Sequence, residues 1–118
     1  MNSATATPAN LTQTSTLRAS FGAVIDPGLL VLTSLAGGPK HGYAITEDIL
    51  EQTGIRLGPG TLYGSLTKLV ERGLIAPLKS EDRRRPYEIT PAGQAALEAQ
   101  LASWSRIVEA GRARLQWG

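Results

Sequence analysis

One face of a helix predicted between Pro59 and Arg72 carries the residue types best suited to binding chemistry. Apolar side chains recur with the i, i+4, i+7, i+8 spacing of a buried stripe at Leu62, Leu66, Leu69 and Val70. The opposite face is slender, polar and cationic, and carries Thr61, Gly64, Ser65, Lys68 and Arg72. Cations bind phosphates and guanine edges, and hydroxyls pair with base edges, so this helix suits the major groove of DNA. The alternative is an ordinary solvated helix face.

Gly64 lies inside this helix, where a glycine costs about 1 kcal/mol relative to alanine. Its expected benefit is the close approach of the helix to another backbone. On the alternative interpretation the glycine is incidental.

A second candidate site is the segment from Lys79 to Arg85, which joins two short extended runs and which we call the wing. It carries four basic residues, Lys79, Arg83, Arg84 and Arg85, against the two acids Glu81 and Asp82. Three consecutive arginines suit phosphates or a narrow minor groove. The alternative is a charged tip that protects the sheet edges from aggregation.

The sequence Lys40-His41-Gly42-Tyr43 opens another predicted helix and offers a third candidate site. Free N–H groups at a helix start, together with Lys40, can bind a phosphate. On a purely structural interpretation, His41 only caps the helix. Tyr43 would then be a core residue with its hydroxyl at the surface, and we expect it to combine both roles.

Composition excludes most catalytic and metal chemistry. The chain has 118 residues, no Cys and one His, so a structural zinc site and a disulfide framework are excluded, and we expect neither metal nor cofactor. No phosphate-loop, dinucleotide or nucleophile motif accompanies His41, so we do not expect an enzyme. The acids Glu47, Asp48 and Glu51 are expected on a solvated face. The net charge of +2 does not decide the partner.

The elements that position these sites follow in a simple order. Asp26-Pro27 begins a buried apolar helix, with Asp26 as its cap, and Gly37-Gly38-Pro39 ends it. Two helices follow, over about His41 to Gln52 and from Pro59 to Arg72. Extended runs at Leu74–Lys79 and Pro86–Thr90 then predict an isolated two-stranded ribbon. Three helices and a hairpin form a winged helix-turn-helix, so the fold class is mainly α with a small β-hairpin.

The two ends of the chain complete the expected organisation. Residues 1–23 are rich in Thr, Ser and Ala and predict a flexible arm, which Leu11, Leu17 and Phe21 could dock on a partner subunit. Residues 24–90 form the winged domain, and residues 91–118 a long C-terminal helix. The chain shows no secretory signal and no membrane span, so we expect a cytoplasmic protein.

The C-terminal helix carries an apolar seam at spacings of 4, 3, 4, 3 and 4: Leu97, Leu101, Trp104, Val108, Gly111 and Leu115. Ala96 and Ile107 widen it. Running to about Arg114, such a helix is about 36 Å long, more than the small domain can cover, so we expect a homodimer with a palindromic DNA site. Trp104 at the two-fold axis is either packing or a stacking surface for a planar aromatic effector.

Three motifs resemble the PadR family of bacterial transcriptional regulators: GGPKHGYAI, GPGTLYGSLTKLVERGLI and RRRPYEITPAG. The resemblance implies a winged-helix repressor of the short subfamily with a single C-terminal dimerisation helix. It also implies that His41, Gly42 and Tyr43 lie near the DNA backbone. Gly60, Thr61, Leu62 and Tyr63 would begin the recognition helix, and Arg85, Pro86 and Tyr87 would belong to the wing. Some family members release DNA when an aromatic compound binds at the dimer interface, and Trp104 resembles the tryptophan found there.

The sequence therefore predicts a DNA-binding transcriptional regulator, specifically a repressor released by a small aromatic or drug-like ligand. The alternative is a winged-helix module for protein or small-molecule binding with little specific DNA affinity.

Overall fold

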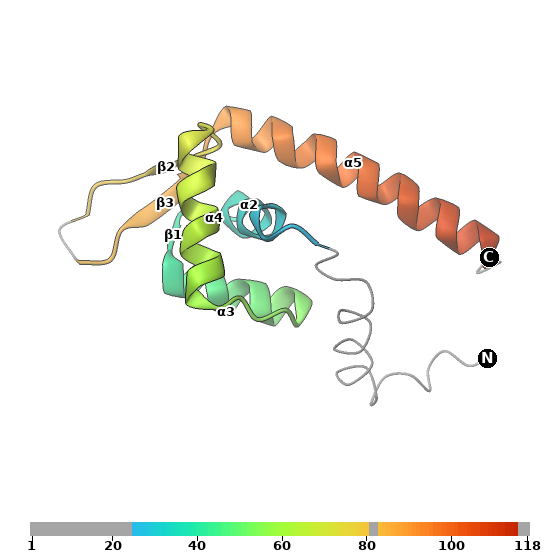
Figure 1. The fold of residues 1–118 in the computed structure, drawn as a ribbon. Coiled ribbons are helices and arrows are strands. Elements are labelled where there is room, and N and C mark those ends of the chain that lie inside the picture. The colour runs from blue at the N-terminus through green and yellow to red at the C-terminus, as the bar shows by residue number, and fades with distance from the viewer. Residues whose placement is uncertain (1–24, 81–82, 116–118) are drawn as a thin grey trace.

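The computed structural model describes residues 25–80 and 83–115, so the predicted arm and the acids at the wing tip lie outside the described residues. The chain order of the elements confirms the expected fold class (Figure 1). They are α2 (Pro27–Ala36), β1 (Lys40–His41), α3 (Gly42–Thr53), α4 (Pro59–Glu71), β2 (Ile75–Pro77), β3 (Pro86–Ile89) and α5 (Pro91–Arg114). None of the helices among the described residues combines the length and apolar character needed to cross a membrane.

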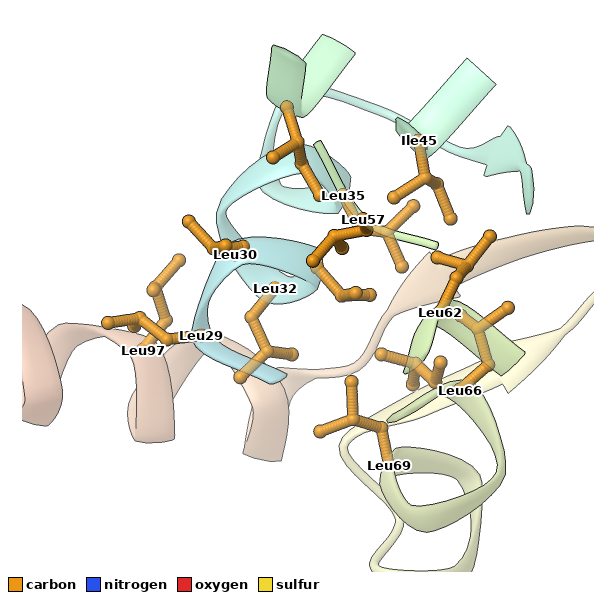
Figure 2. Close-up of a cluster of buried hydrophobic side chains, with 13 residues drawn as sticks. Leu29, Leu30, Leu32, Leu35, Ile45, Leu57, Leu62, Leu66, Leu69 and Leu97 are labelled. Carbon is orange, nitrogen blue, oxygen red and sulfur yellow. The ribbon is translucent and has the colours of Figure 1, made fainter. Parts of the chain in front are cut away.

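The core is built around α2, which is apolar on nearly all sides and is packed against α3, α4 and α5. Figure 2 shows its leucines meeting Ile45 of α3, Leu62, Leu66 and Leu69 of α4, and Leu97 of α5. Burying these side chains removes apolar area from water, which is the main favourable term in folding. The predictions of a buried first helix and of a leucine stripe on α4 are therefore confirmed.

The sheet has three strands in the order β1-β3-β2, so the expected isolated two-stranded ribbon is wrong. Lys40 pairs with Tyr87 and His41 with Pro86, both in antiparallel register. The turn before β1 uses Gly38 at φ 136°, a conformation that favours glycine. The additional strand, β1, therefore connects the start of α3 to the base of the wing.

The start of α5 is fixed against the end of α4 through Thr90. The Thr90 hydroxyl donates to the carbonyl of Gly73 at 2.7 Å and accepts from the amide of Gly93 at 3.0 Å. Gly93 is buried, and a Cβ there would overlap the carbonyl oxygen of Leu74 and lie 2.8 Å from Cγ1 of Ile89. Gly93 therefore allows α5 to begin directly against the sheet.

Gly93→Ala is expected to lower the free energy of unfolding by about 2–3 kcal/mol, because the added methyl group must displace backbone. Urea denaturation followed by circular dichroism measures the change. Gly64→Ala is the matched control, since a Cβ at Gly64 meets no atom within 4 Å. Equal stability of the Gly93 variant and the wild type would contradict the packing described for this junction.

Candidate nucleic-acid interface

The polar face of α4 is open to solvent over most of its length. Thr61, Gly64, Lys68 and Arg72 are exposed, and Ser65 is half-buried. Together with Gly60 and the start of α2 at Asp26, Pro27 and Gly28, these residues line a shallow depression. The structure thus brings together the residues that the sequence pattern assigned to the recognition helix. It also adds an acid, Asp26, beside a face that is free of acids on the helix wheel.

Gly64 has no internal reason to be glycine. A Cβ at this position would meet nothing within 4 Å, and the same holds at Gly60. Neither residue has a positive φ. The described residues therefore set no limit on side-chain size at either position.

Gly64→Ala is expected to raise the free energy of unfolding by about 1 kcal/mol, because alanine favours a helix interior. The same variant is expected to bind DNA about tenfold more weakly, since the methyl group holds α4 away from the groove. Denaturant titration and fluorescence anisotropy on labelled duplex give the two values. Unchanged DNA affinity in the stabilised variant would show that Gly64 has no role in DNA binding.

A second depression lies between the start of α3, α4 and the wing. Its walls are His41, Gly42, Tyr43, Tyr63, Arg83, Arg84, Arg85 and Tyr87. The side chains of Tyr43 and Tyr63 are 69% and 54% exposed, so the expectation that Tyr43 is partly a core residue is wrong. Exposed tyrosines beside arginines offer hydroxyl donors and cations to one ligand, as the phosphate backbone of DNA requires.

His41 caps α3 and faces the wing with its other ring nitrogen. Its Nδ1 accepts from the amide of Ala44 at 3.4 Å. Nε2 lies 3.5 Å from Nη1 of Arg84, whose guanidinium can only donate. In the tautomer with the proton on Nε2, the ring and the guanidinium can both donate to one anionic oxygen. The expected cap and the expected phosphate contact are compatible in a single side chain.

Lys40 is held by its own chain. Its ammonium donates to the carbonyls of Ser34 at 2.6 Å and Gly38 at 3.3 Å, at the carboxyl end of α2. It also lies 4.0 Å from the carboxylate of Asp48, which accepts from the Ser34 hydroxyl at 2.7 Å. Cations stabilise helix carboxyl ends, so this geometry gives Lys40 a structural role, while the phosphate contact expected for it stays a prediction. Asp48 belongs to this cluster and not to a solvated face.

Gly42 is buried and acts as a spacer. A Cβ there would lie 2.9 Å from the Tyr63 hydroxyl oxygen and 3.4 Å from Leu62 Cδ2. Its small size therefore lets α3 approach α4 and sets the position of Tyr63. Gly42 also lines the depression with His41 and Tyr43, and the DNA contact expected of it stays a prediction.

Thr67 was missed as a candidate site residue. With Tyr63, Glu71, Arg85 and Tyr87 it lines a further hollow between α4 and the wing. Thr67 is exposed one turn after Tyr63, and its hydroxyl donates to the Tyr63 carbonyl at 3.0 Å. A helix wheel places Thr67 on a polar flank, but only the position of the sheet shows that this flank faces the wing.

The apolar seam of α5 divides between the core and the surface. Leu97 is 6% exposed and packs beside Leu29, so it is a core residue of its own chain and not part of a free seam (Figure 2). Trp104 is partly buried against the core. Beyond it α5 extends past the rest of the domain (Figure 1), where Ile107 and Val108 are 61% and 46% exposed. Leu101 and Leu115 are also exposed.

Comparison with known proteins matches the "Transcriptional regulator PadR-like family" over residues 31–99. A Streptomyces fradiae protein encoded in a transposon is 48% identical over 82 residues, which are 70% of this chain and 24% of that protein. A transcriptional regulator of Mycobacterium tuberculosis is 41% identical over 75 residues, covering 58% of this chain and 66% of the relative. The chain thus spans less than two thirds of the length of each of these relatives.

A PadR family transcription regulator from Clostridium difficile has the same fold, with a TM-score of 0.66 at 23% identity over 76% of this chain and 97% of that one. The winged-helix fold agrees with the family match. The PadR-like family is one of DNA-binding transcriptional regulators and not of enzymes. The chain belongs to the PadR-like family of transcriptional regulators.

Proposed function

We propose that the chain is a cytoplasmic homodimeric repressor that binds palindromic double-stranded DNA and is released by a small planar aromatic ligand. One observation carries the proposal: hydrogen-bond donors and cations from α4, α3 and the wing lie together around α4. The hydroxyls and cations of α4, the capped start of α3 at His41 and the wing arginines line neighbouring depressions. Such a surface can fill a major groove while holding the phosphates on one side of it.

Phosphate contacts in this proposal come from His41 and the wing. The Nε2–H of His41 and the guanidinium of Arg84 converge on one anionic oxygen, which would tie the wing to α3 when DNA binds. Arg83 and Arg85 extend the contact along the backbone or into the minor groove. Thr61, Ser65, Lys68 and Arg72 would meet base edges or position the helix.

The proposed dimer forms through the far half of α5. Leu101, Val108 and Leu115 expose an apolar stripe with heptad spacing, which Ile107 widens, and a second copy is the simplest partner that covers it. Two-fold symmetry would then place the two α4 helices about 34 Å apart, one turn of DNA, which is the spacing of a palindrome.

The proposed effector site uses Trp104. The Trp104 side chain is partly buried against the core, and its neighbours Leu101 and Val108 are exposed. A planar compound could stack on the outer side of the ring once the second chain supplies the opposite wall. Ligand binding there would alter the angle between the two α5 helices and so the spacing of the α4 helices.

Fluorescence anisotropy on labelled DNA from upstream of the chain's own gene, against a shuffled duplex at two salt concentrations, tests the DNA-binding part. Preference for the native duplex with a steep salt dependence supports the proposal, and equal weak binding to both duplexes contradicts an operator there.

The effector site is tested by fluorescence. Trp117→Phe leaves Trp104 as the single tryptophan, and saturable quenching of its emission by proflavine supports the ligand site. In a matched variant that also carries Trp104→Phe, where the fluorescence of the dye reports binding, proflavine binding is expected to be lost.

A further inference from the structure

Asp26 presents an unused carboxylate at the edge of the α4 face. It stands at the cap position of α2, but its side chain accepts no hydrogen bond from the helix, contrary to the cap expected from the sequence. The backbone carbonyl of Asp26 accepts from the amides of Leu29 and Leu30 instead, at 3.0 and 3.4 Å. The helix therefore begins without help from the carboxylate. No ion pair joins this carboxylate to a Lys or Arg within the part of the chain that the structure describes.

The sequence Asp26-Pro27-Gly28 holds the carboxylate toward α4. A Cβ at Gly28 would lie 3.0 Å from Oδ2 of Asp26 and 3.7 Å from Cδ2 of Leu69, so Gly28 fills the narrow space between Asp26 and α4. Asp26 shares one depression with Thr61, Ser65, Lys68 and Arg72. Among these side chains the carboxylate is the one group that can only accept hydrogen bonds.

A carboxylate in this position favours one part of DNA over another. Phosphates carry negative charge and only accept, so they are repelled from Asp26. Base edges in the major groove include the exocyclic amino groups of cytosine and adenine, which donate, and Asp is a known acceptor for the cytosine amino group. The depression between α2 and α4 therefore suits base edges, whereas the wing side of α4, with its arginines, suits the backbone.

We propose that Asp26 is a specificity-determining residue that accepts a hydrogen bond from an exocyclic amino group of cytosine or adenine in the operator, next to the bases contacted by α4. This inference rests on the proposed DNA-binding function and assigns one base contact within it. Lys68 and Arg72 lie beside the carboxylate and reduce the cost of bringing it close to DNA.

The test uses the full chain and a randomised duplex library. The wild type first selects its preferred duplex, and anisotropy then measures the affinity of each variant for that duplex and for a shuffled one. Asp26→Ala removes both the acceptor oxygens and the charge, and it leaves α2 intact because the carboxylate makes no cap bond. Glu98→Gln, on an exposed position of α5, is the charge-matched control.

Asp26→Ala is expected to bind the shuffled duplex about two- to fivefold more tightly, because a repulsive charge is gone. It is expected to bind the selected duplex about fivefold more weakly, the effect of one lost base contact, so the ratio of the two affinities falls about tenfold or more. Library selection with the variant then shows relaxed choice at one base pair of each half-site.

An affinity ratio within twofold of the wild type overturns the proposal, whether both affinities rise together or neither changes. A ratio that falls equally in Glu98→Gln also overturns it, because the effect would then follow net charge. Failure of the wild type to select any sequence is a different result. It appears before any variant is made and contradicts the proposed operator binding itself.

Discussion

Replacing Arg83, Arg84 and Arg85 together with alanine is expected to weaken DNA binding by about 1,000-fold or more at about 0.15 M salt. Each wing offers three cations near the groove side of α4, and a dimer presents two wings. Phosphate contacts release condensed counterions, each contributing about 0.9 to the slope of log affinity against log salt. Losing six contacts therefore makes the slope smaller by about 5.

Anisotropy titrations at four or five salt concentrations measure both quantities. The wing arginines are exposed and remote from the core, so the thermal midpoint of the triple variant should stay close to that of the wild type. Arg106→Ala on α5 removes a cation from an exposed position away from α4 and serves as the charge control. A triple variant with an unchanged salt slope would mean that the wing only protects the sheet edges.

Val108→Glu is the second change with a large expected effect. Val108 is 46% exposed in the single chain and lies on the apolar stripe of α5, so a carboxylate there would be buried without a partner in the proposed dimer. The dimer is expected to dissociate at micromolar concentration. DNA affinity should then fall by about 1,000-fold, toward non-specific binding, because a monomer holds only one half-site.

Sedimentation velocity measures the association state, and anisotropy on the same samples measures DNA binding. Ala110→Glu is the matched control, since it adds the same charge half a turn away on the opposite side of the helix. It should remain a dimer and bind DNA normally. A Val108→Glu protein that is still dimeric would show that the exposed stripe of α5 is not the interface.

Local patterns were enough to predict the elements that have strong periodicity. Leu62, Leu66 and Leu69 define the buried side of α4, and the polar face opposite them is exposed as expected. The Thr90-Pro91 start of α5 and the glycine stop at Gly73 depend only on cap chemistry within a few residues. These features are decided by neighbouring residues along the chain.

Features decided by distant residues could not be read in this way. β1 has two residues, too few for an alternating pattern, and exists because β3 pairs with it. Lys40 precedes a helix start, but the Gly38 turn returns it to the carboxyl end of α2. Leu97 has the same heptad spacing as Val108, yet it meets Leu29 of its own chain. Spacing alone cannot distinguish a partner within the chain from one outside it.

The measurement to make first is an amide chemical-shift map of the full chain by NMR, with and without its selected duplex. Residues around α4, His41, Tyr43 and the wing are expected to shift together, while the amides of Leu29 and Leu97 in the core stay in place. Shifts concentrated on α5, with Thr61, Gly64 and Lys68 unmoved, would contradict the assignment of the DNA-binding surface.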